Sequence, residues 1–303
     1  MVASFLAALF FALNATCGAR NVQAHGSVRA NLSRLVVATI ALALFAHTIG
    51  NGYASASLPW YLLSGVIGMG IGDLGTYEAL PRLGSRLTVL LTQCLAAPIA
   101  ALGEWWWLGT RLTVTQIAWG ALILIGVATA ISPSRSNPPK VRVRPIGVWF
   151  GLLAAAGQGL GALVSRKGVL VADAAGEATH NAIFGLTATY QRIVAGFVFT
   201  ALWFGVLVLL RRTQPPASAH REKVPHAGWW LLANGLAGPV FAVGCYQWAL
   251  ATTPSGIVLP IAATAPLLAM PIAYWLEGDR PTRRAVVGGV VAVTGCVALT
   301  LSR

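Results

Sequence analysis

Hydrophobic residues along the chain gather into long runs that short polar stretches separate. Each run is about 17 to 23 residues long, enough for a helix to cross about 30 Å of hydrocarbon. We therefore predict ten membrane-spanning helices, five in each half of the chain. They are expected at residues 2–19, 32–48, 58–80, 87–105, 114–131, 146–164, 187–210, 229–251, 256–276 and 284–301.

The two halves repeat one order of features. Residues 60–129 and 229–299 both open with a tryptophan and a glycine-rich run, pass through a tyrosine-containing cluster, and reach a Pro-Ile-Ala motif followed by an acid. An odd number of spans per copy makes the second copy enter the membrane from the opposite face. The predicted fold is all-α: ten transmembrane helices as two inverted five-helix repeats, 1–131 and 146–303, joined by a basic, proline-rich linker at 132–145. Matched pairs are Arg34 with Arg192, Ser85 with Ser255, Pro98 with Pro271, and Glu104 with Glu277.

Composition supports a membrane protein. Of the 303 residues, 56% are hydrophobic and 10% are charged, well under half the ~25% charge typical of soluble domains. The net charge of +13 would favour nucleic-acid binding in a soluble chain, but here Lys and Arg lie in the gaps between apolar runs, as topological signals do. We expect a multi-pass protein of the cell (inner) membrane, with lipids and a small-molecule solute as partners and no nucleic acid. The oligomeric state stays open.

The sequence offers little for metal or cofactor chemistry. The four cysteines each stand alone in an apolar run, and the five histidines are scattered, so no metal-ligand spacing exists and no cofactor is expected. The stretch 70–75 fits G-x-G-x-x-G, but a dinucleotide fingerprint needs a strand before a helix. Inside an apolar run, glycines four apart, such as Gly68 and Gly72 or Gly157 and Gly161, indicate close helix packing.

A membrane-embedded enzyme acting on a lipid or lipid-linked substrate is the alternative class. Such an enzyme needs a nucleophile with its base, a metal cluster or paired carboxylates. The best candidate is a loop with Asp173, Glu177 and His180. We interpret it as a solvated connection and expect no enzyme.

The doubled set of motifs resembles the EamA-type members of the drug/metabolite transporter superfamily. The resemblance covers essentially the whole chain. It rests on the paired arginines and Pro-Ile-Ala motifs, on the closing glycine-rich helices around 120–126 and 288–295, and on Gly72-Asp73 and Gly157-Gln158. The resemblance implies a secondary transporter that moves a small metabolite or drug-like solute by alternating access, without a bound cofactor. It does not name the solute.

Asp73 is the acid placed deepest in the membrane. It lies seven residues from the end of its run, roughly 10 Å inside the span at 1.5 Å per residue. A charged Asp at mid-membrane costs about 2.5 to 3.5 kcal/mol unless it faces a wet cavity, finds a partner or binds a proton. We predict Asp73 as the substrate-contact or coupling residue, with Tyr77 one turn on; a packing role is the alternative. Glu78 is expected to pair with Arg82 at the interface.

Other polar residues within the spans complete the predicted substrate or coupling site. They are Asn14, Arg34, Gln158, Arg192, Tyr246 and Gln247. The two arginines either snorkel outward or face a cavity and hold an anion. Pro98 and Pro271 are predicted to kink their helices and serve in gating. Glu104 and Glu277 are expected at the membrane rim as structural anchors.

Two signals of orientation disagree. With their flanking turns, the odd-numbered connections hold 16 of the 21 Lys and Arg residues and the even-numbered ones hold four. The positive-inside rule then places both termini outside. The family resemblance places both termini inside.

Overall fold

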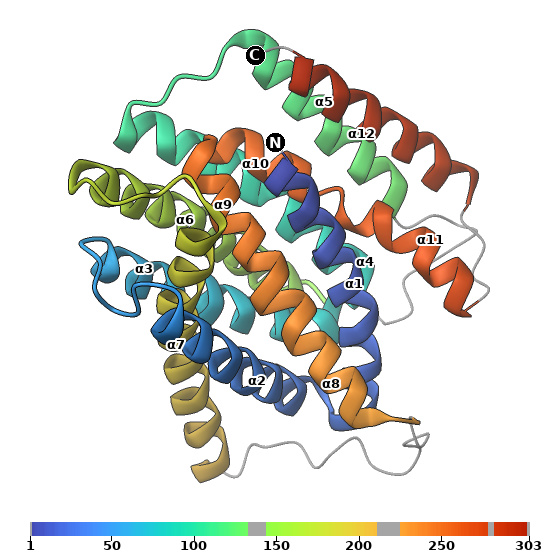
Figure 1. The fold of residues 1–303 in the computed structure, drawn as a ribbon. Coiled ribbons are helices and arrows are strands. Elements are labelled where there is room, and N and C mark those ends of the chain that lie inside the picture. Colours follow the sequence, from blue (N-terminus) through green and yellow to red (C-terminus); the bar gives the residue numbers. More distant parts are fainter. Residues whose placement is uncertain (1, 133–143, 211–224, 278–281, 302–303) are drawn as a thin grey trace.

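The computed structural model describes residues 2–132, 144–210, 225–277 and 282–301, and this part of the chain is helical with no strand. Figure 1 shows the helices packed into one bundle. The elements of the first half are α1 (Val2–His25), α2 (Ser27–Thr48), α3 (Leu58–Gly65), η1 (Val66–Gly72), α4 (Asp73–Gly103), η2 (Glu104–Leu108) and α5 (Val114–Ile131). Those of the second half are α6 (Ile146–Ala174), α7 (Ala182–Leu209), α8 (Ala227–Gly235), η3 (Leu236–Ala242), α9 (Val243–Thr252), α10 (Ser255–Ala262), α11 (Ala265–Glu277) and α12 (Arg283–Leu301).

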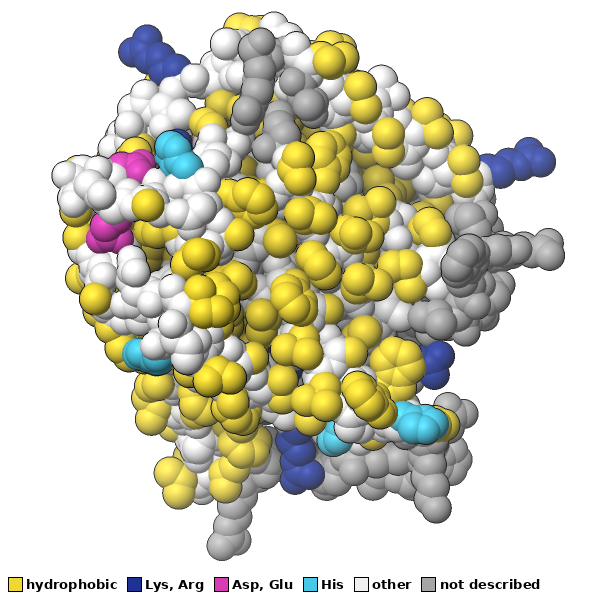
Figure 2. Space-filling model, viewed as in Figure 1, with side chains coloured by type: hydrophobic (Ala, Val, Ile, Leu, Met, Phe, Trp, Pro, Cys, Tyr) yellow, Lys and Arg dark blue, Asp and Glu magenta, His cyan; other side chains and the backbone are white. Residues whose placement is uncertain are grey.

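The outer surface of the bundle is apolar. Trp106, Leu202 and Val290 are 86%, 68% and 62% exposed, and Figure 2 shows hydrophobic side chains over most of one face. A soluble protein would bury many of these side chains, whereas lipid accepts them. By length and composition, seven helices of the described residues are candidate membrane spans. The predicted all-α, multi-pass membrane class is confirmed.

Glycines bring α6 against α3, η1 and the start of α4. A Cβ placed on Gly161 would lie 3.0 Å from Cα of Gly68, and one on Gly72 would lie 3.3 Å from Cα of Gly157. Only a residue without a side chain fits such a crossing. The predicted packing role of these glycines is confirmed.

The boundary predicted at residues 81–86 is not a helix break, because α4 stays helical from Asp73 to Gly103. One proline there removes a single backbone donor, which bends a helix rather than ending it. The chain nevertheless reverses direction along α6. Along α6, Gly147, Gly157 and Gly168 meet Arg82, Gly72 and Trp60, which descend in number. Gly151, Gly159 and Leu163 meet Leu91, Ala96 and Gly103, which ascend.

Two seven-residue π-helical segments occupy matched places in the two halves. η1 follows α3, and η3 follows α8; Val66 and Leu236 are 170 residues apart, as are Gly72 and Ala242. Isolated π turns of this kind occur often at functional sites. By this register Asp73 corresponds to Val243, so the second half lacks the acid.

Candidate functional site

Asp73 and Arg34 form an ion pair inside the bundle. Arg34 Nη2 donates to Asp73 Oδ2 at 2.9 Å, and each side chain is 13% exposed. Arg34 Nε also donates to Asn31 Oδ1 at 2.8 Å. Asp73 is the first residue after η1, and Arg34 is in α2, so the pair joins α2 to the start of α4. Two predicted site residues therefore lie together.

Arg192 lies deeper and is 3% exposed. It is ten residues into α7, about 15 Å from the helix start at 1.5 Å per residue, which is half the thickness of a bilayer core. Its guanidinium packs against Gly68 of η1 and Gly161 of α6. The Nε atom has no hydrogen-bond partner within the described part of the protein.

Tyr246 and Gln247 bring α9 to the same centre. Tyr246 is 8% exposed and lies within electrostatic reach of Arg192. Gln247 is fully buried, and neither atom of its amide finds a hydrogen-bond partner among the residues described. A buried amide without partners is unusual, because leaving it unpaired costs about 1 to 3 kcal/mol.

Three other predicted residues stand apart from this centre or cannot be placed. Asn14 accepts a hydrogen bond from Asn234 at 2.7 Å, and Asn234 accepts one from Asn21, which makes an amide network between α1 and α8. Gln158 is half-buried beside the Gly157 crossing. Tyr77 belongs to α4, but its side chain is outside the described residues.

Pro98 and Pro271 lie within continuous helices, α4 and α11, and both are exposed on the outer surface. The interruption in the second half falls instead at Ala263 and Thr264, between α10 and α11. A proline at position 266 suits this place, since its missing N–H is not needed in the first turn of a helix. Gating by Pro98 and Pro271 stays a prediction.

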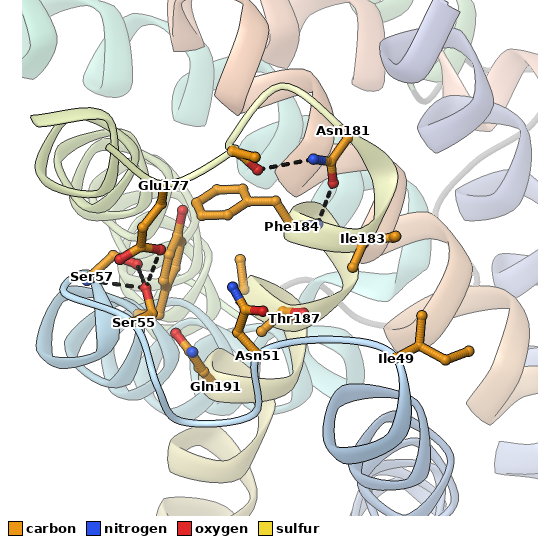
Figure 3. Close-up of a pocket in the computed structure, with 13 residues that line it drawn as sticks. Ile49, Asn51, Ser55, Ser57, Glu177, Asn181, Ile183, Phe184, Thr187 and Gln191 are labelled. Carbon is orange, nitrogen blue, oxygen red and sulfur yellow. Dashed lines mark hydrogen bonds between the residues drawn. The ribbon is translucent and has the colours of Figure 1, made fainter. Parts of the chain in front are cut away.

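A cavity of about 240 Å³ opens at one end of α7, beneath the loop that precedes α3. Figure 3 shows Glu177, in the loop between α6 and α7, pointing toward the loop that precedes α3. Glu177 accepts hydrogen bonds from Ser55 Oγ at 2.8 Å and from the Ala56 N–H at 2.7 Å. We call this contact the Glu177 latch. Deeper in the cavity, Gln191 donates to the carbonyl of Gly52 at 2.9 Å.

A buried cluster of side chains packs beside this cavity. Tyr61, Phe184, Ala188 and Ala251 belong to one buried cluster, which we call the Tyr61 layer. The first three of them also line the cavity. Arg192 follows Ala188 by one helical turn in the direction away from the start of α7; Gln191 lines the cavity, and Arg192 is not one of the lining residues.

Glu104, expected at the membrane rim as a structural anchor, is 1% exposed. Its carboxylate accepts from Arg166 Nε at 3.2 Å, from the Ser255 N–H at 2.7 Å and from the Ser255 hydroxyl. Arg166 also donates to the carbonyls of Leu250 and Ala251. Glu104 therefore links the first half to the start of α10. These contacts agree with the expected structural role, and the position at the membrane rim stays a prediction.

The loop considered as an enzyme site uses its acids for local contacts. Asp173 accepts from Thr179, Glu177 forms the latch, and His180 is exposed. No group of three or more His, Cys, Asp or Glu residues that could hold a metal ion occurs in the described ranges.

Comparison with known proteins decides the family. The model of the EamA-like transporter family matches residues 1–132 and 145–301. The chain belongs to the EamA-like transporter family. The resemblance inferred from the sequence is thus confirmed, and membership of this family points to a membrane transporter rather than an enzyme.

Two individual proteins are similar to this EamA-like chain. A probable terminal-alkyne amino-acid exporter of Streptantibioticus cattleyicolor is 25% identical over 283 residues, which cover 89% of this chain and 83% of that protein. One solved protein crystal structure shares 17% sequence identity with this chain and superposes with a TM-score of 0.72. The match covers 99% of this chain and 96% of the chain in that structure. The second likeness concerns the fold alone.

Proposed function

We propose that this protein is a secondary transporter that exports a small amino-acid-like solute across the cell membrane by alternating access, coupled to protons through Asp73. The observation that carries the proposal is the Arg34–Asp73 ion pair, 13% exposed on each side, within apolar spans. A charged pair at such a place is expensive to bury and is typical of substrate or ion pathways.

The proposed architecture is ten spans in two inverted five-helix repeats. The matched π segments η1 and η3 support it, as does the reversal of the chain along α6, which divides α4 between two spans. Arg34 and Asp73 come from the first repeat, and Arg192, Tyr246 and Gln247 come from the second. A site between the repeats near the midplane is what inverted repeats provide.

Proton coupling follows from the ion pair. A proton bound by the Asp73 carboxylate removes its charge and releases Arg34, so the two protonation states favour different packings of α2 against α4. A solute that binds one of the two packings more tightly would shift this equilibrium. The solute class is taken from the name of the Streptantibioticus cattleyicolor relative.

The test is counterflow in proteoliposomes loaded with unlabelled amino acids. Wild-type protein should accumulate labelled solute transiently, with a rate that depends on pH. The change Asp73→Asn keeps the shape and removes the titrating group, so we expect a lower rate without that pH dependence. Glu78→Gln is the matched control, because Glu78 pairs with Arg82 at 2.6 Å near the end of its span and is half-exposed. Wild-type rate and pH profile in Asp73→Asn protein would refute the assignment.

A further inference from the structure

The inference drawn from the buried centre concerns the anionic end of the solute, and it rests on the transport function proposed above. Arg192 is 3% exposed with an unpartnered Nε, and Gln247 is 0% exposed with both amide atoms unpartnered by any described residue. Polar groups as buried as these are nearly always hydrogen-bonded in a folded protein. Their state here indicates that a ligand supplies the missing partner.

The helices that carry these groups run antiparallel. A Cβ on Gly185 of α7 would meet Trp248 of α9, whereas Ile193, further along α7, shares a core cluster with Val240, which precedes α9. Residue numbers therefore rise along α7 in the direction in which they fall along η3 and α9.

This arrangement puts the two unpartnered side chains on the same side of the Tyr61 layer. Ala188 and Ala251 belong to the layer. Arg192 follows Ala188 by four residues and Gln247 precedes Ala251 by four, so each lies one turn beyond the layer, away from the start of α7.

No described acid lies within ion-pair distance of Arg192, although Asp73 is within electrostatic reach of it. Among the acids whose side chains the structure describes, Asp73 pairs with Arg34 and Glu104 pairs with Arg166. A guanidinium buried without an anion is unfavourable, and its forked donors fit a carboxylate. The glycines at 68 and 161 make room for the guanidinium at this depth, since a Cβ on Gly161 would lie 3.0 Å from Arg192 Nη2.

We propose that Arg192, assisted by the Gln247 amide, binds the carboxylate of the transported solute at mid-membrane. The solute class is therefore a small monocarboxylic acid, α-amino acids included, and not an amine. Neutralising the guanidinium with this carboxylate would let a charged solute pass the centre of the membrane as part of a paired ion.

The first experiment measures efflux from proteoliposomes of the standard amino acids, each beside its α-amide, which lacks the negative charge. Wild-type protein should move one or more acids and leave the matching amide. Arg192→Met should reduce transport of the acid by about 10- to 100-fold, as loss of a charge-assisted hydrogen bond implies. Equal transport of acid and amide, or an unchanged rate in Arg192→Met protein, overturns the carboxylate site but leaves the transport function intact. If no acid and no amide moves, the proposed function fails.

The second experiment measures thermal unfolding of solute-free protein in detergent, which separates a binding role from a structural one. Replacing an unpaired buried charge with an apolar side chain of similar size stabilises a protein. Arg192→Met should therefore raise the Tm. Arg166→Met is the matched comparison and should lower it, because Arg166 is paired with Glu104. A lowered Tm in Arg192→Met protein would show a structural contact and overturn the inference.

Discussion

Buried arginines in this protein differ in whether they meet an acid. Arg34 and Arg166 each pair with a carboxylate, at 2.9 and 3.2 Å, whereas Arg192 has no described acid within ion-pair distance. The paired arginines hold spans together. The unpaired one is available to a ligand. This difference between cations inside the bundle separates scaffold from candidate binding site.

Removing the carboxylate of Glu104 should destabilise the fold. Glu104→Ala leaves Arg166 and the Ser255 N–H without their partner in a site that is 1% exposed. Loss of one member of a buried pair costs about 3 to 5 kcal/mol. Thermal unfolding in detergent should show a much lower Tm, while Ser255→Ala, which removes only a hydroxyl, should lower it less. Equal Tm values for Glu104→Ala and wild type would contradict the account.

The site residues were partly predictable from the sequence. Asp73 was identified by its depth within an apolar run. Arg34 and Arg192 were identified separately, because they form a matched pair in the repeat. Their contacts were not predictable, because contact between Arg34 and Asp73 depends on how α2 packs against η1 and α4. The contact between Glu104 and Ser255 was not predictable for the same reason: the run ends at Glu104, and the start of α10 covers it.

At the scale of elements, the apolar runs predicted the all-helical membrane class and where most of the described helices lie, and they did not predict the backbone detail. The segments η1 and η3 remain inside apolar runs, where a π turn has the same composition as an α turn. The break at 263 and 264 was missed because several prolines compete for that role in one run. Glycine spacing was the most informative local signal, since close helix crossings leave room only for glycine.

Replacing a glycine at such a crossing with alanine should lower the stability of the protein. A Cβ on Gly75 would lie 2.7 Å from the Ala154 backbone nitrogen and 2.9 Å from the Phe150 carbonyl oxygen. Gly75→Ala should therefore separate α4 from α6 and destabilise the protein by about 1 to 3 kcal/mol, the usual cost of overpacking.

Gly205→Ala in α7 is the control, because nothing lies within 4 Å of its Cβ position. Helix propensity alone should make it neutral or more stable by about 0.5 to 1 kcal/mol. Both variants can be compared by chemical or thermal unfolding in one detergent. An order of stability with Gly75→Ala above Gly205→Ala would be incompatible with the described crossing.

At the scale of the whole molecule, the connections between helices lie at two ends of the bundle, and hydrogen bonds at each end show which connections belong together. Glu177 joins the loops before α3 and before α7 at one end. At the other end, the Arg144 N–H donates to the Arg82 carbonyl at 2.9 Å. The cavity belongs to the first end, and most Lys and Arg residues belong to connections of the second. The charge distribution therefore predicts that the cavity faces the exterior.

Labelling with an impermeant thiol reagent in intact cells tests this orientation. In a background without the four native cysteines, Ala178→Cys beside the cavity should react, and Gly228→Cys at the other end should not. Both positions are exposed. The reverse pattern would favour the orientation implied by the family resemblance, with both termini inside.

The most direct test of alternating access is a cross-link between the two loops that meet at the cavity. Ser55 Oγ and Glu177 Oε2 meet at 2.8 Å in the latch, so cysteines at both positions are within reach of a short bifunctional thiol reagent that forms reducible disulfide links. If the two loops must separate in each transport cycle, the cross-linked Ser55→Cys, Glu177→Cys protein should lose counterflow, and reductant should restore it. The two single variants, treated alike, should keep counterflow. Undiminished counterflow in protein shown to be fully cross-linked would contradict the account.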